Sequence, residues 1–184
     1  MTPARVTGEA FLAALIANPG DRGTLGPYAD WLEENGDPVQ AAFIRKRMED
    51  PPQPQKEHSW DRVSGNIADM QGLTIAKINR KNDELTFTDI TGKCFRFYHD
   101  QDCCESVSIE DVAGDLNDLI GNPLTMAEWE TSDKNPEGVV REWQDSFTWT
   151  FYRFATVKGY VTVRWYGESN GYYSETVDLE VYTR

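Results

Sequence analysis

The fold is decided by residues 147–166, FTWTFYRFATVKGYVTVRWY. Bulky residues alternate with polar ones on both sides of Lys158-Gly159, and this period of two predicts two antiparallel strands joined by a tight turn. The alternation predicts that each strand buries one face through three side chains: Phe147, Trp149 and Phe151, then Val161, Val163 and Trp165. Residues 176–182 alternate in the same way, with Val177, Leu179 and Val181 inward. We therefore expect the three strands to form an antiparallel meander.

The residues before this stretch predict further strands and one short helix. Strand patterns cover 73–79, 84–88, 94–98, 107–109 and 124–130, and a helical turn covers 115–120. Together they predict a β-rich domain over residues 57–184, with an antiparallel sheet that is buried on one face and wetted on the other. Since helices precede this domain, the fold class is α+β.

The N-terminal residues predict a small helical module over 1–50. Apolar residues recur at helical spacing in 8–17, and further helices are expected from Pro27 to Glu34 and from Pro38 onward, where Asp37 can cap. Residues 51–56 contain three prolines and cannot continue a helix, so they predict a linker between the two units. A fragment of residues 57–184 is expected to fold alone, whereas residues 1–50 are too few to be stable by themselves.

The helical module resembles a known bacterial family over about residues 8–49. The resemblance rests on residues 11–47, FLAALIANPGDRGTLGPYADWLEENGDPVQAAFIRKR, with its YADWLEE-G-D core and closing FIR. These residues resemble the repeat-companion domain. The resemblance implies a helical module attached to varied neighbours, with no known catalytic residues.

The β-rich domain resembles a second family, over roughly residues 70–182. Two unusual blocks carry this resemblance, QDCCE at 101–105 and RWYGESNGYYSE at 164–175. Both are similar to an uncharacterised domain of bacteriophage and bacterial proteins. The resemblance implies no established activity.

Charge and cysteine usage limit the classes of partner. The chain has 31 acidic and 18 basic residues and a formal net charge of -13, so direct binding to nucleic acid or to a membrane surface is not expected. Three cysteines, two of them adjacent, do not form a disulfide framework and fit a reducing compartment. No stretch approaches the roughly 20 apolar residues of a membrane span. We therefore expect a cytoplasmic protein.

A block directly after the 94–98 strand gathers groups that can bind metals. Imidazole, carboxylates and thiols follow one another in His99, Asp102, Cys103, Cys104 and Glu105. These groups suit zinc, yet adjacent cysteines lack the C-x2-C spacing of common zinc sites. The alternative, which we favour, has no cofactor: a cysteine is buried as a small apolar side chain, and His99 and Asp102 hold a turn by hydrogen bonds. Cysteine catalysis is disfavoured because the neighbouring carboxylates raise a thiol pKa.

The segment before the last strand has the composition of a binding loop. Tyrosines supply contact area, and Gly, Ser and Asn supply adaptable polar contacts, in Tyr166, Glu168, Ser169, Asn170, Tyr172 and Tyr173. The alternative is a wide hairpin that turns at Asn170-Gly171 and whose tyrosines cover the sheet edge. Adjacent residues of an extended segment face opposite ways, so only one of Tyr172 and Tyr173 is expected to join the buried face.

The hypothesis that fits these features best is a non-enzymatic binding protein for an unknown protein or small ligand. An acidic, phage-related domain invites the sharper hypothesis of an inhibitor or immunity-type factor that occupies a basic surface. The alternative is a metal-dependent enzyme built on the 99–105 block.

Overall fold

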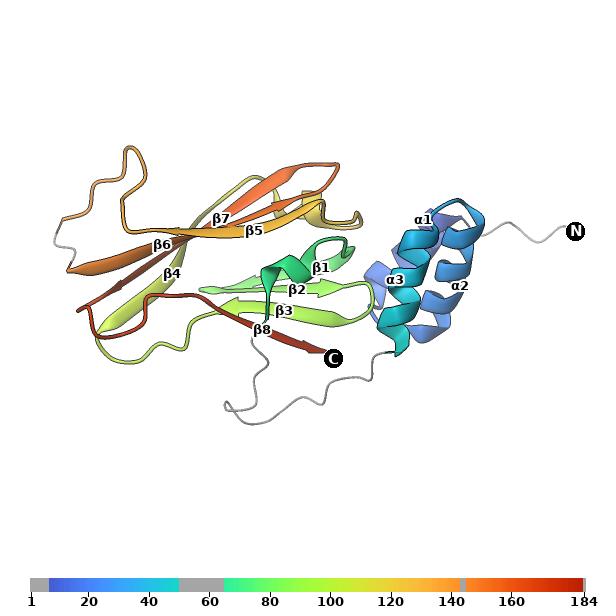
Figure 1. Cartoon of the computed structure of the whole chain (residues 1–184), viewed down its shortest axis with the longest axis horizontal. Coiled ribbons are helices and arrows are strands. Elements are labelled where there is room, and N and C mark those ends of the chain that lie inside the picture. Colours follow the sequence, from blue (N-terminus) through green and yellow to red (C-terminus); the bar gives the residue numbers. More distant parts are fainter. Residues whose placement is uncertain (1–6, 50–64, 143–144, 184) are drawn as a thin grey trace, which may run out of the picture.

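The computed structural model describes residues 7–49, 65–142 and 145–183. The expected linker at 51–56 lies outside these residues. The described chain has the α+β class that the sequence predicts: three α-helices come first, and two antiparallel four-stranded sheets follow (Figure 1).

The two sheets pack face to face as a sandwich. The first has the order β1-β2-β3-β8, with bounds Ile75–Lys81, Glu84–Asp89, Lys93–Tyr98 and Asp178–Thr183. The second has the order β4-β7-β6-β5, with bounds Glu105–Ala113, Tyr160–Ser169, Ser146–Ala155 and Met126–Ser132. Among the described residues of this part there are also two short 3-10 helices, η2 (Ile67–Met70) and η3 (Leu116–Leu119).

Aromatic rings from both sheets form the centre of the core. Phe97 of β3 lies with its ring centroid 4.7 Å from that of Tyr152 in β6, and Phe87 of β2 lies 4.8 Å from Phe154 in β6. Val161, Val163 and Trp165 of β7 belong to the same cluster, and Val177, Leu179 and Val181 pack against it. The inward faces expected of these two stretches are therefore confirmed.

The inward face expected for the 147–151 stretch is wrong. In β6 the residues that enter the core are Tyr152 and Phe154, whereas Trp149 is buried on the outer face of the sheet. There its ring lies 4.9 Å from Tyr166, its N–H donates to Asn135 Oδ1, and Arg141 covers both rings. Because β6 is covered on both faces, alternation of aromatic and polar residues does not identify the inner one.

The expected meander is also wrong at its last strand. β8 does not pair with β7; it pairs with β3 in the other sheet, with Phe97 opposite Leu179. The chain therefore crosses from one sheet to the other between β7 and β8. A local pattern specifies a strand and its faces, but not which edge it joins.

The helical module contains α1 (Gly8–Ala17), α2 (Arg22–Glu34) and α3 (Pro38–Glu49). The start expected for the second helix, Pro27, is wrong, because Pro27 lies inside α2. The true start follows Asp21, whose carboxylate accepts hydrogen bonds from the Gly23 N–H and the Thr24 hydroxyl. This cap satisfies the Gly23 N–H and fixes the start of the helix at Arg22, five residues before the proline.

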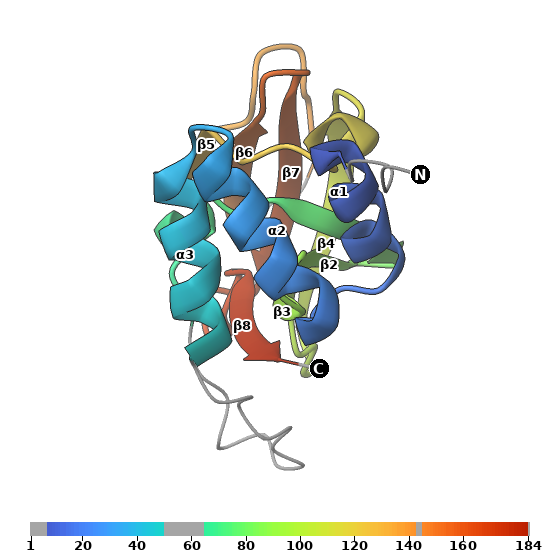
Figure 2. The same cartoon turned by 90° about the vertical axis from the view of Figure 1, so that its right-hand side faces the viewer.

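The three helices cover one end of the sandwich (Figure 2). Ala76 of β1 and Ile90, from the turn after β2, join the apolar cluster of the helices. Two hydrogen bonds fasten the contact: Gly20 N–H to Ile90 O at 2.9 Å, and Gln40 Nε2 to Gly72 O at 3.1 Å. The separate folding of residues 57–184 stays a prediction, and such a fragment would expose Ala76 and Ile90 to water.

The turn between β2 and β3, which packs against the helices, is held together by the buried carboxylate of Asp89. Asp89 is 1 % exposed, and its Oδ1 accepts from the backbone N–H groups of Thr91 and Lys93 and from the Thr91 hydroxyl. Burial raises the pKa of this carboxyl, while the hydrogen bonds oppose that rise. Asp89→Ala leaves two N–H groups without their acceptor, so we expect it to lower the free energy of unfolding by about 1 to 3 kcal/mol in urea denaturation.

Thr91→Ala is the matched control, because it removes the hydroxyl and keeps both backbone bonds. We expect it to cost roughly 1 kcal/mol or less. If Asp89→Ala were as stable as Thr91→Ala, the carboxylate would not organise the turn.

Candidate functional site

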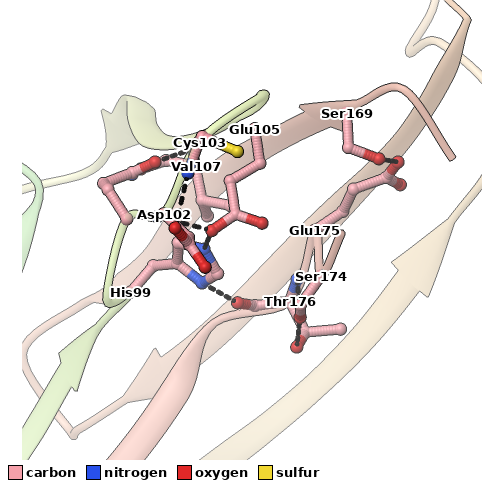
Figure 3. A network of polar contacts seen from close by, with 10 residues as sticks. His99, Asp102, Cys103, Glu105, Val107, Ser169, Ser174, Glu175 and Thr176 are labelled. Carbon is pink, nitrogen blue, oxygen red and sulfur yellow. Dashed lines mark hydrogen bonds and ion pairs between the residues drawn. The ribbon is translucent and has the colours of Figure 1, made fainter. Parts of the chain in front are cut away.

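The two segments that the sequence singled out meet at the end of the sandwich farthest from the helices (Figure 1). One is the connection from β3 to β4, which carries His99 to Cys104, and the other is the crossover from β7 to β8. Hydrogen bonds join them directly: His99 donates to the Thr176 carbonyl (Figure 3), and the Cys103 thiol donates to the Tyr173 hydroxyl. Sequence analysis predicts two separate candidate sites, whereas in the structure the two segments form one surface.

A buried histidine and glutamate hold this surface together. The side chains of His99 and Glu105 are only 5 % and 3 % exposed, and His99 Nε2 lies 3.0 Å from Glu105 Oε1. His99 Nδ1 lies 2.8 Å from the Thr176 carbonyl, which can only accept, so Nδ1 carries a proton. One further proton therefore lies between Nε2 and the carboxyl group, whichever of the two carries it.

Glu105 also closes the turn before β4. Its Oε1 accepts from the Asp102 N–H at 2.8 Å (Figure 3). Nearby, Gln101 Nε2 donates to the Val107 carbonyl at 2.8 Å. The expectation that His99 and Asp102 hold a turn by hydrogen bonds is correct: His99 bonds to Glu105, and Asp102 donates its N–H to Glu105 and accepts from the Cys103 N–H at Oδ1. β3 ends at Tyr98 and β4 begins at Glu105, so a strand holds the block at each end.

Both cysteines of the block are exposed, contrary to the expectation that one is buried. The buried cysteine is Cys94, in β3. Cys103 Sγ lies 3.1 Å from Tyr173 Oη and 3.4 Å from Cys104 Sγ. The hydrogen bond to Cys103 is the largest cause that raises the pKa of the Cys104 thiol, and Asp102 and Glu105 add to the rise. The expected effect of the carboxylates is confirmed for this thiol.

The β7–β8 crossover packs back onto the second sheet. Glu175 accepts hydrogen bonds from the hydroxyls of Ser169 at 2.7 Å and Thr148 at 2.8 Å. A Cβ on Gly167 would lie 2.2 Å from the Glu175 carbonyl oxygen, so only glycine permits this approach. The wide hairpin considered for this segment is therefore wrong, since its two ends belong to different sheets.

The two adjacent tyrosines of the crossover have different surroundings. Tyr172 is 86 % exposed, and Tyr173 is half-buried against Cys103. Neither joins the sheet face, contrary to the expectation, because residues 170–177 are not a strand. Tyr172 is instead held outward by a turn in which its N–H donates to Asn170 Oδ1.

A shallow polar pocket of about 360 Å³ lies between the two segments; its lining residues are Cys104, Glu105, Ser106, Asp145, Glu168, Ser169 and Asn170. Sequence analysis missed Ser106 and Asp145, which lie at the start of β4 and just before β6 and carry no local signal. Tyr166, a predicted binding residue, is only 3 % exposed and does not line the pocket. Its hydroxyl donates to Glu168 Oε2, so it supports a lining residue from behind.

The described part of the chain contains no group of three His, Cys, Asp or Glu side chains that could hold a metal ion. In the 99–105 block, both nitrogens of His99 and the Oε1 of Glu105 are already used in hydrogen bonds. None of the helices in the described ranges is long and apolar enough to cross a membrane.

A second hollow, of about 410 Å³, lies between the edge strands β5 and β8. Trp129, which is 56 % exposed, Tyr152 and Leu179 give it an apolar wall, and Thr131 and Asp178 add polar groups. Burial, and then the charge of Asp178, raises the pKa of Tyr152. Sequence analysis did not foresee this hollow, because it depends on β8 crossing to the other sheet.

Residues 68–179 match DUF7448, a domain of unknown function. The chain belongs to this family. The DUF7448 region begins in η2 and ends in β8, so it contains both segments of the candidate site and leaves the helical module outside. Searches of the curated proteins and of the solved structures found no match. The uncharacterised domain expected from the QDCCE and RWYGESNGYYSE blocks is confirmed, whereas the repeat-companion resemblance and the link to phage stay predictions.

Proposed function

We propose that this DUF7448 protein is a non-enzymatic binding protein that recognises a basic segment of a partner protein with the surface formed by its 99–105 and 166–176 segments. The observation that carries the proposal is the exposed Tyr172 on a loop that is held rigid beside an acidic pocket. Its ring is presented to solvent, while Ser169, Asn170 and Glu175 fix the loop beneath it. A rigid aromatic beside adaptable polar groups is typical of recognition loops.

Charge supports a basic partner. The pocket contains the carboxylates of Glu105, Asp145 and Glu168, with no basic residue among its lining residues. The whole chain carries a formal net charge of -13. Electrostatic attraction then favours a partner with Lys or Arg and speeds its approach at low salt.

The internal use of the polar groups favours binding over catalysis. His99 and Glu105 are buried, and they form hydrogen bonds with each other, with the Thr176 carbonyl and with the Asp102 N–H. These groups therefore hold the surface together and are not directed at a substrate. The finer form of the proposal is an inhibitor or immunity-type factor of phage origin, which acts in the cytoplasm by covering a basic surface. The helical module then serves as an accessory docking unit at the opposite end.

Site-specific photocrosslinking in the native host tests the proposal. A photoreactive phenylalanine analogue at position 172 is expected to give a discrete adduct with one protein, and the yield should fall as salt is raised, because salt screens exposed charges. The control is the same analogue at Val157, which is 80 % exposed on the β6–β7 turn at the other end of these strands. Equal adducts at both positions, or none at 172, would reject the proposal.

A further inference from the structure

The adjacent thiols of Cys103 and Cys104 form a pair that the proposed function does not use. Both side chains are exposed, and their sulfur atoms lie 3.4 Å apart. The third cysteine, Cys94, is buried at 0 % exposure, and its sulfur contacts the Thr88 hydroxyl and the Gly92 carbonyl. The chain thus offers one exposed dithiol and one enclosed single thiol.

The backbone on both sides of the pair is fixed. The Cys103 N–H donates to Asp102 Oδ1 at 2.8 Å, and the Asp102 N–H donates to the buried Glu105. Cys104 has a φ of 67°, which lies in the left-handed region. The Cys103 thiol points at Tyr173 Oη, so the phenol lies beside the pair. Two thiols that are held close before binding lose little freedom when both bond to one atom.

We propose that Cys103 and Cys104 form a chelating site for trivalent arsenic compounds in which the arsenic atom retains one organic substituent. Other soft, thiol-binding atoms with the same low coordination number would bind in the same way. The bound centre takes one sulfur from each residue. With an arsonous acid, R–As(OH)2, two As–S bonds form and two As–OH bonds break. Each thiol proton leaves with one hydroxide as water, so two water molecules are released and nothing is oxidised or reduced.

The surroundings favour a centre of this kind over zinc. A structural zinc site requires four ligands, whereas the nearby His99 and Glu105 are occupied by each other. Thiol sulfur selects soft centres, and two thiols satisfy an arsenic atom that keeps its third substituent. Asp102, Glu105 and Glu168 give this end of the domain negative charge, which repels anionic thiol reagents but not a neutral arsonous acid.

Titration of the purified, phosphine-reduced full chain with phenylarsine oxide tests the site. We expect one equivalent to bind, and we expect Cys103→Ser and Cys104→Ser each to weaken binding about 100-fold, because each loses the second, intramolecular bond. Both side chains are exposed, so both variants should melt like the parent. Cys94→Ser, which keeps the pair, should bind like the parent.

A loss of less than tenfold in Cys103→Ser or Cys104→Ser would overturn the proposal, as would an equal loss in Cys94→Ser. The test needs no partner protein, so it is independent of the proposed function. Tyr172→Ala is expected to keep its arsenical affinity and to lose partner contact, which separates the two proposals.

Discussion

Phe97→Ala is expected to lower the free energy of unfolding by about 3 to 5 kcal/mol, because it removes a buried ring that the core cannot refill. Phe97 is 1 % exposed, and its ring lies within 6.0 Å, between centroids, of Phe87, Tyr152 and Phe154. These neighbours come from both sheets, so the ring joins the two halves of the sandwich. Guanidinium or urea denaturation measures the loss.

Two control variants sharpen this experiment. Phe97→Leu keeps an apolar side chain of moderate size, so a clearly smaller loss is expected. Tyr172→Ala removes an aromatic ring that is 86 % exposed and should change stability by no more than roughly 0.5 kcal/mol. If Phe97→Ala cost no more than Tyr172→Ala, the two sheets would not share the core described here.

The sequence predicts most of the local structure because its signals are local. The turn at Lys158-Gly159 and the alternation beside it identify β6 and β7, and the 8–17 spacing matches α1. The sequence does not predict the start of α2, because Pro27 is a stronger local signal than the capping residue Asp21. A capping carboxylate is a weaker pattern in a sequence than a proline, although it decides where the helix begins.

Long-range pairing is what the sequence could not predict. β8 joins β3 across more than 80 residues of chain, as in the pair Phe97 and Leu179, and no local pattern selects that edge. The same crossover brings the Tyr172 loop against Cys103. Sequence analysis found both segments by their composition, but their union into one site follows from the topology alone.

His99→Ala is expected to destabilise the protein by about 3 kcal/mol or more, because it leaves the buried Glu105 without its partner. Both side chains are at most 5 % exposed, and His99 also donates to the Thr176 carbonyl of the crossover. Chemical denaturation measures the loss. Photocrosslinking from position 172 should fall at the same time, since the loop that carries Tyr172 loses one of its anchors.

A double variant separates the loss of a partner from the cost of an uncompensated charge. His99 Nε2 and the Asp102 N–H both contact Oε1 of Glu105, so the amide of Glu105→Gln can serve only one of them when His99 is neutral: its oxygen accepts from Asp102, or its nitrogen donates to His99. We expect the loss of one such bond to cost about 1 to 3 kcal/mol. In His99→Ala/Glu105→Gln no buried charge remains, so the double variant should be more stable than His99→Ala alone. Losses that simply add would show that His99 acts through its contact with Thr176 and not through the proton it shares with Glu105.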